Sequence, residues 1–349
     1  WAEAKLPQNF QIIDSDDQVR LIKRIMKSQD IDDKKWPARQ AAWFINGQKD
    51  EGKRAHEVAS GDDLFQITHK RIYQAYEEVC DQGGLVDFAE LLLRSHELWL
   101  NDSQLLGHYQ QRFTHLLVDE FQDTNTIQYA WLRVLAGQTS KVMAVGDDDQ
   151  SIYGWRGAKI ENIHQFTSDF AEVATVRLEQ NYRSTQTILE AANGLIQRNT
   201  NRLGKELWSD GDKGELLKVY AGFNDLDEAR FIAERIQQWV EDGGSPDEAA
   251  ILYRSNAQSR VLEEALLRLN IPYQIYGGQR FFERAEIKNA LAYMRLMEDR
   301  HSDPAFERVV NVPPRGIGAR TVEIVRQQAR TDNTSLWTAA KALTASEGL

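Results

Sequence analysis

The sequence has 349 residues, 42% of them hydrophobic, which is more than one core usually holds, so we expect two or more domains. Its 42 basic and 53 acidic residues give a formal charge of −11, which argues against a histone-like DNA coat but leaves room for a local DNA groove. A single cysteine, Cys80, excludes an internal disulfide. The sequence shows neither a signal peptide nor an apolar run of roughly 18 residues, so we expect a cytoplasmic protein with no membrane partner.

Residues 1–113 are predicted to be helical. The segment from Ser15 to Gln18 has the pattern of a capping box, and apolar residues follow it at helical spacing. Further helices are predicted over residues 38–45, 69–80 and 88–99.

After Thr114 the pattern changes to one typical of an α/β fold. Short apolar runs that end in acidic residues or glycine predict buried parallel strands at residues 116–118, 142–145 and 175–178. A second set of strands is predicted at residues 216–220, 250–253 and 273–276, alternating with amphipathic helices over residues 226–240 and 257–269. Beyond Gly278 the helical pattern returns.

The first of these strands leads directly into two carboxylates, Asp119 and Glu120. Ligands of open α/β sheets lie at the carboxyl ends of the strands. Asp119 could hold Mg²⁺, directly or through water, and Glu120 could polarise the water that attacks a γ-phosphate. The alternative is a strand end capped by solvated acids.

The next strand leads into residues 146–158 (GDDDQSIYGWRGA). The amide of Gln150 can donate to and accept from a phosphate without adding charge. Tyr153, Trp155 and Arg156 bring two rings and a guanidinium together, a group that stacks on bases without reading their sequence. The alternative is that both aromatic side chains belong to the core.

Two further segments carry candidate ligand-binding residues. Tyr182 and Arg183 follow the run at 175–178, where Tyr182 offers a ring to a nucleobase and Arg183 could reach a phosphate; they could also be a plain surface pair. Further on, Gly316 and Gly318 precede a predicted helix over residues 321–330, so backbone N–H groups could approach a phosphate there. Arg315 and Arg320 would add charge, and a helix-helix turn is the alternative.

Together these segments resemble the superfamily 1 DNA helicases of the UvrD, Rep and PcrA group. The matching segments are residues 84–92, 118–123, 146–158, 180–184, 251–260 and 276–284. The resemblance implies a P-loop NTPase fold with RecA-like lobes and all-helical inserts, and an ATP-dependent 3′ to 5′ motor on DNA. Its expected domains are a helical insert at 1–113, lobe segments at 114–179 and 180–276, and a second helical insert from 277 to 349.

The resemblance also implies roles for single residues. Asp119 would belong to the Mg²⁺ site, Glu120 would be the general base, and Gln150 would couple the γ-phosphate of ATP to DNA. Tyr182 would stack on adenine and Arg183 would act as the arginine finger. Single-stranded DNA would lie along Tyr153, Trp155 and Arg156, and the duplex at a single-strand/double-strand junction would contact Arg315, Gly316, Gly318 and Arg320.

An ATPase of this kind needs a G-x-x-x-x-G-K-S/T loop. Residues 47–54 are the only near match, but they end in Arg54 and no apolar strand precedes them, so we expect a surface turn in the helical insert. The chain begins with Trp1 rather than Met. We therefore expect an internal fragment, inactive by itself, with the phosphate loop before Trp1 and later motifs beyond Leu349.

Two other functions fit parts of the pattern. One is the motor part of a RecB or AddA kind of helicase-nuclease. The close match of the motif sequences to those of UvrD argues against it. The other is a DNA-binding module that has lost its P-loop, which would have no use for Glu120, Gln150 and Arg183 together.

Overall fold

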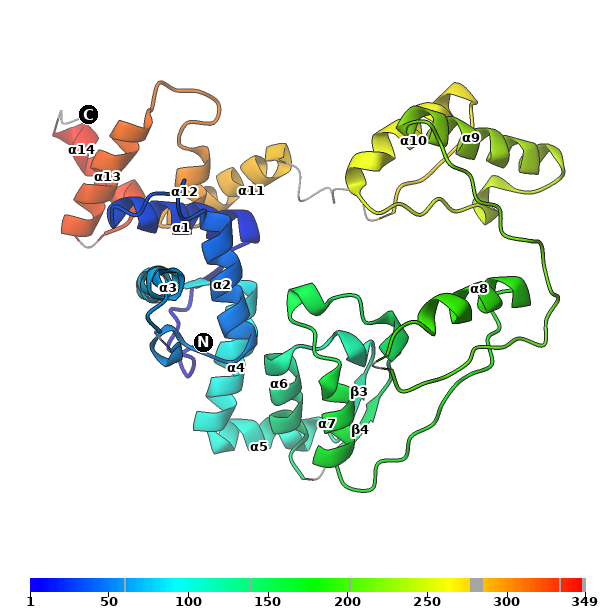
Figure 1. Ribbon diagram of the computed structural model, residues 1–349. Coiled ribbons are helices and arrows are strands. Elements are labelled where there is room, and N and C mark those ends of the chain that lie inside the picture. The colour runs from blue at the N-terminus through cyan, green and yellow to red at the C-terminus, as the bar shows by residue number, and fades with distance from the viewer. Residues whose placement is uncertain (60, 139, 201, 277–284, 333, 347–349) are drawn as a thin grey trace. The chain divides into compact units, whose positions relative to one another are not determined.

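The computed structural model describes every residue except 60, 139, 201, 277–284, 333 and 347–349 (Figure 1). The chain forms two compact units, Trp1–Leu217 and Lys218–Leu349. The described part is mostly helical, with two small parallel sheets of two strands each. Across these residues, no helix is both long and apolar enough to cross a membrane.

The first unit begins with helices. The predicted ones are α1 (Ser15–Ser28), α2 (Ala38–Asp50), α3 (Leu64–Gly83) and α4 (Phe88–Asn101); α5 (Ser103–Arg112) and a short 3-10 turn η1 (Ala55–Glu57) were not predicted individually. The predicted cap is wrong by one residue. Asp14 caps α1 by accepting a hydrogen bond from the Asp17 N–H at 2.8 Å, and Ser15 is already helical. The Asp14 side chain thus takes the part that the predicted capping box gave to Ser15, because its carboxylate reaches the N–H of the third residue of the helix.

Helices α1, α2 and α3 enclose the main hydrophobic core. A parallel pair of two-residue strands, β1 (Gln11–Ile12) and β2 (Leu85–Val86), joins the start of the chain to the start of α4, and the sequence did not predict it. Cys80, on α3, lies in this core, where burial raises the pKa of its thiol to about 12.

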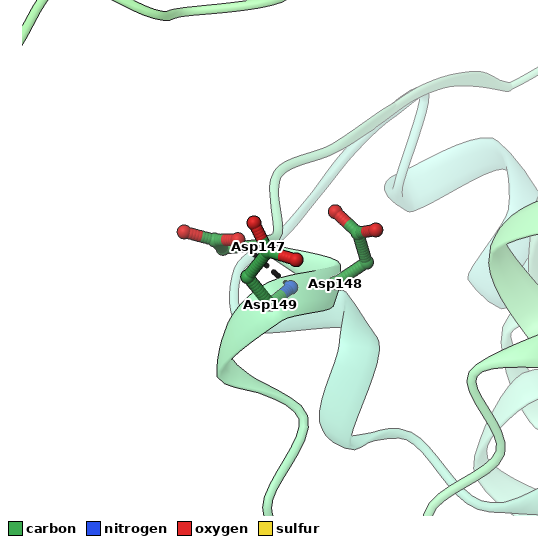
Figure 2. Close-up of side chains that lie close together, drawn as sticks. All are labelled: Asp147, Asp148 and Asp149. Carbon is green, nitrogen blue, oxygen red and sulfur yellow. Dashed lines mark hydrogen bonds between the residues drawn. The ribbon is translucent and has the colours of Figure 1, made fainter. Parts of the chain in front are cut away.

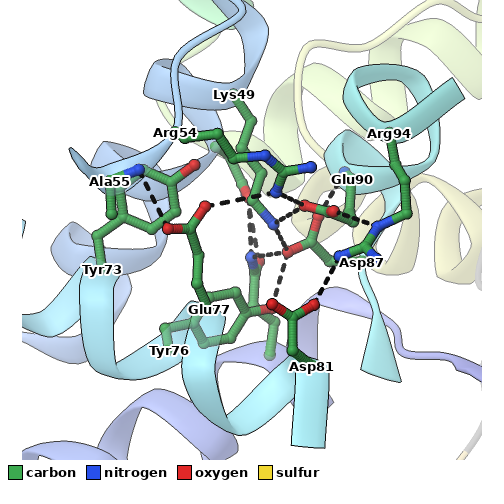
Figure 3. Close-up of polar contacts among 12 residues, drawn as sticks. Lys49, Arg54, Ala55, Tyr73, Tyr76, Glu77, Asp81, Asp87, Glu90 and Arg94 are labelled. Atoms are coloured by element: carbon green, nitrogen blue, oxygen red, sulfur yellow. Dashed lines mark hydrogen bonds and ion pairs between the residues drawn. The ribbon is translucent and has the colours of Figure 1, made fainter. Parts of the chain in front are cut away.

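A network of buried charges lies beside that core (Figure 3). Lys49 is 2% exposed, and its Nζ lies 2.7 Å from Asp87 Oδ2 and 2.9 Å from Glu90 Oε2. Tyr76 donates its hydroxyl proton to Asp87 at 2.8 Å, and Arg54 Nη1 lies 2.9 Å from Glu90. Burial opposes the charge of each group, but the ion pairs outweigh it, so the pKa of Lys49 is raised and that of Glu90 is lowered to about 2.

The structure corrects the expectation for residues 47–54 in part. The segment ends α2 and continues into a turn at Glu51 and Gly52, where Glu51 and Lys53 are exposed, but it also buries Lys49. Lys49 is bound by two carboxylates, whereas the lysine at the position that the loop motif requires is Lys53.

The rest of the first unit contains the predicted strands β3 (His115–Val118) and β4 (Lys141–Ala144), which pair in parallel. The helices α6 (Thr126–Ala136) and α7 (Glu161–Asp169) lie beside them (Figure 1). Phe121, Tyr129, Leu132 and Phe166 pack on one face of the pair, against side chains of both strands. α4 contacts α6, where the Trp99 and Trp131 rings lie 4.7 Å apart.

Three predicted strands do not form in the described residues. No strand is present at 175–178, at 216–220 or at 250–253. Val176 and Leu178 are each 79% exposed, which shows that no neighbouring strand covers them. A strand is defined by its hydrogen-bonded partner, and the one bridge described near this segment joins Gln180 to Trp208. These strands were predicted from apolar runs alone, and the runs have no strand partner among the described residues.

The remaining helices are α8 (Gln186–Ile196) in the first unit, and, in the second, α9 (Asp225–Glu241), α10 (Ser259–Arg268), α11 (Ala285–Glu298), α12 (Asp303–Val309), α13 (Ala319–Thr331) and α14 (Leu336–Ala345). The helices predicted at 226–240, 257–269 and 321–330 are confirmed by α9, α10 and α13. No paired strand is found at 273–276 in the described part of the second unit. The motif at 276–284 lies outside the described residues apart from Tyr276.

Candidate nucleotide and DNA site

Asp119 and Glu120 lie at the carboxyl end of β3, as predicted, and both are exposed. The backbone of Glu120 is left-handed, with φ 50° and ψ 41°. For a residue other than glycine this costs about 1–3 kcal/mol and persists only where neighbouring contacts enforce it. Two hydrogen bonds do so: Val145 N–H donates to Val118 O at 2.7 Å, and Phe121 N–H donates to Val145 O at 3.0 Å. They join the segments that follow β3 and β4.

The segment after β4 contains two 3-10 turns, η3 (Asp148–Gln150) and η4 (Gly154–Arg156). Gln150 Nε2 donates to Asp147 Oδ2 at 2.7 Å, so the amide expected to sense phosphate is held by its own loop. The carboxylate of Asp147 also accepts from Lys205. Burial acts against the charge on Asp147, but the hydrogen bonds from Lys205 and Gln150 outweigh it and hold its pKa below the usual value.

Three adjacent carboxylates, those of Asp147, Asp148 and Asp149, form a cluster in this loop (Figure 2). Arg202 binds Asp149 through Nε at 2.8 Å and Nη2 at 2.6 Å, and Leu203 N–H donates to Asp148 at 2.6 Å. With Lys205 on Asp147, all three acids have partners from residues 202–205. The sequence analysis gave none of these residues a role, although three successive acids in one loop were a usable signal for nearby cations.

Tyr153, Trp155 and Arg156 are brought together as predicted. The guanidinium carbon of Arg156 lies 5.2 Å from the Tyr153 ring centroid and 4.6 Å from that of Trp155. Trp155 is 71% exposed, so the interpretation that it belongs to the core is wrong. An exposed ring beside a cation offers a face on which a base can stack.

We expect Trp155→Ala to weaken single-stranded DNA binding by roughly 1–3 kcal/mol, with little dependence on base sequence, because stacking needs only a π-face. Fluorescence anisotropy with labelled oligonucleotides measures the affinity. Trp43→Ala is the matched control, since Trp43 is 73% exposed on α2, outside this loop. Equal affinity of the folded Trp155→Ala variant and the parent would contradict the stacking role.

Tyr182 and Arg183 are both exposed, Tyr182 by 85%. The Tyr182 hydroxyl donates to Gln180 Oε1 at 2.8 Å, and Asn181 holds the Arg183 backbone N–H at 2.9 Å. Across the described residues, no hydrogen bond or ion pair joins the Arg183 guanidinium to the β3 carboxylates. These two side chains are open to a ligand but are not assembled with Glu120.

The candidate duplex contact lies in the second unit. Arg315 is exposed, but its guanidinium is held by the chain itself: its Nη1 donates to the carbonyls of Val309 at 2.8 Å and Val312 at 3.1 Å, and its guanidinium lies over the Tyr293 ring. Arg315 therefore closes the end of α12. Gly318 is the N-cap of α13 and provides no side chain to its first turn, so the N–H groups there, next to Arg320, keep the geometry that suits a phosphate.

Family comparison identifies the class of protein that carries this set of carboxylate, amide and aromatic residues. Residues 2–171 match the UvrD/REP helicase N-terminal domain, and residues 176–341 match the UvrD-like helicase C-terminal domain. The chain belongs to the UvrD-like helicase family.

Similar proteins carry helicase names. DNA helicase II of Escherichia coli (strain K12) is 62% identical over 341 residues, which is 98% of this chain and 47% of that protein. A probable DNA helicase II homolog of Rickettsia felis is 42% identical, covering 96% of this chain and 52% of that protein. The ATP-dependent DNA helicase PcrA of Staphylococcus aureus is 40% identical, covering 96% and 46%. The chain thus spans about half the length of these curated relatives.

Proposed function

We propose that this chain is part of an ATP-dependent 3′ to 5′ DNA helicase, a motor whose ATP hydrolysis is stimulated by single-stranded DNA. The observation that carries the proposal is the hydrogen-bonded junction of the β3 and β4 ends. Hydrogen bonds at this junction connect the segment that carries the Glu120 carboxylate to the loop that carries Gln150 and Trp155. A motor of this kind must link the hydrolysing group to the DNA-binding group.

In this proposal, ATP binds with Mg²⁺ at the carboxyl end of β3. Asp119 fits as the metal ligand because it is an exposed carboxylate, the ligand type that Mg²⁺ prefers, and it accepts only the Glu120 N–H at 2.9 Å among the hydrogen bonds described, whereas Asp147 and Asp149 are paired with cations. The metal ion would neutralise phosphate charge. Glu120 would orient the attacking water, Gln150 would sense the γ-phosphate, Tyr182 would stack on adenine and Arg183 would approach the phosphates on lobe closure.

DNA would contact both units. Single-stranded DNA would stack along Tyr153, Trp155 and Arg156, and the duplex would meet the start of α13 through Gly316, Gly318 and Arg320. Arg315 would hold that turn through its hydrogen bond to the end of α12. We further propose that residues 114–179 and 180–276 belong to two RecA-like lobes, with helical inserts at 1–113 and 277–349.

Strand separation by a full-length protein that contains this chain tests the proposal. Duplexes carrying either a 3′ or a 5′ single-stranded tail are incubated with ATP and Mg²⁺. We expect unwinding of the 3′-tailed duplex alone, and none without ATP. Preference for the 5′ tail would contradict the polarity, and the absence of unwinding and of DNA-stimulated hydrolysis would contradict the helicase assignment.

A further inference from the structure

Gln122 lies between the two loops of the candidate site and is 1% exposed. Its Nε2 donates to Glu120 Oε2 at 2.6 Å, and its Oε1 accepts from the Asp147 N–H at 2.9 Å. Its own carbonyl accepts from Ser151 Oγ at 3.4 Å. One buried side chain therefore joins the carboxylate after β3 to the backbone after β4.

The chemistry of the two partners requires an amide at this position. An ionised carboxylate only accepts hydrogen bonds, and a backbone N–H only donates them, so the bridging side chain must donate at one end and accept at the other. Gly146 makes room for it. A Cβ at position 146 would lie 2.6 Å from Gln122 Oε1 and 3.3 Å from the Gln122 backbone nitrogen.

We propose that Gln122 is a positioning residue that fixes the carboxylate of Glu120 and couples it to the DNA-binding loop. The inference rests on the proposed role of Glu120 as general base. Glu120 is exposed, so its side chain would otherwise rotate among several rotamers. With Oε2 held by Gln122, Oε1 is left to accept a proton from water, in a fixed direction.

The coupling runs through Asp147. The backbone N–H of Asp147 is bound by Gln122, and its carboxylate holds Gln150 and Lys205. Gln150 lies only a few residues before Tyr153 and Trp155 in the same loop. A shift of this loop when DNA binds therefore changes the position of the Gln122 amide, and with it the direction of the Glu120 carboxylate.

The test uses Gln122→Met and Gln122→Glu in a full-length protein that contains this chain. The methionine keeps the side-chain volume and removes both hydrogen bonds. We expect the DNA-stimulated kcat for ATP to fall about 10- to 100-fold, a part of what a general base contributes, and KM for ATP to stay within about threefold, because Gln122 is placed against Glu120 and not against nucleotide.

The glutamate variant separates the two hydrogen bonds of the Gln122 side chain. It keeps an acceptor for the Asp147 N–H, but it loses the donor to Glu120 and places a like charge against that carboxylate. Its kcat should therefore fall at least as far as that of Gln122→Met, while KM for ATP stays within about threefold. Gln128→Ala is the matched control: Gln128 is an amide in the same segment that caps α6 with Asn125, and its loss should leave kcat unchanged.

A double-mutant cycle separates the failure of this inference from the failure of the proposed function. If Gln122 acts through Glu120, adding Gln122→Met to Glu120→Gln should lower kcat less than twofold further. Additive losses, a Gln122→Met kcat within threefold of the parent, or a Gln122→Glu kcat equal to that of the parent would each overturn the positioning role. Retention of activity by Glu120→Gln alone would overturn the assignment of the general base itself.

Discussion

Glu120→Gln, in a full-length protein that contains this chain, is expected to leave ATP binding largely intact and to slow ATP turnover by about 10³-fold or more. The amide keeps the shape of the side chain and its contact with Gln122, but it cannot take a proton from the attacking water. Steady-state ATPase assays with single-stranded DNA give the turnover, and fluorescence titration with a labelled ATP analogue gives the affinity.

A second glutamate provides the control for that experiment. Glu172 is also exposed and also has a left-handed backbone, with φ 56°, but it lies outside the β3 and β4 junction. Glu172→Gln should therefore leave turnover unchanged. Turnover of Glu120→Gln within about tenfold of the parent would show that Glu120 is not the base.

Lys49→Met is expected to lower the free energy of unfolding by about 3–5 kcal/mol, because it leaves the buried carboxylates of Asp87 and Glu90 without their shared cation (Figure 3). Urea unfolding followed by circular dichroism measures the loss. Lys23→Met is the same substitution in an exposed ion pair, with Asp33 at 3.5 Å, and should cost less than about 1 kcal/mol. Equal losses in the two variants would contradict the role of the buried network.

The same network predicts a pH dependence. The folded protein lowers the pKa of Glu90 to about 2 from an ordinary value of 4.5. An unfolded Glu90 thus binds a proton more readily, so its stabilising contribution is present above about pH 4.5 and is lost as the pH falls towards 2. Lys49→Met removes the strongest opposing charge and should flatten this part of the stability profile.

Helices were predictable from the sequence because their determinants are local. The spacing of apolar residues found α1 to α4, α9, α10 and α13, and missed their ends by a few residues. Strands depend on partners elsewhere in the chain. The runs at 116–118 and 142–145 form β3 and β4 because they pair with each other, whereas the run at 175–178 has no strand partner among the described residues.

The same distinction holds for the site. Tyr153, Trp155 and Arg156 are near neighbours in the sequence, so their grouping was predictable. The contact of Lys205 with Asp147 spans 58 residues, and that of Lys49 with Asp87 spans 38 residues, so neither could be seen in a local pattern. Gln122 stood inside a matched motif, but only its two hydrogen bonds give it a role.

The burial of Cys80 makes this chain well suited to thiol labelling. It is the one cysteine of the sequence, and its raised pKa keeps the thiol almost entirely in the unreactive protonated form near neutral pH. A cysteine introduced at an exposed position such as Trp43 or Tyr182 would then react with a maleimide dye far faster than the native thiol. Fluorescent reporters could therefore be attached at chosen sites without first removing Cys80 from the packed interior of α3.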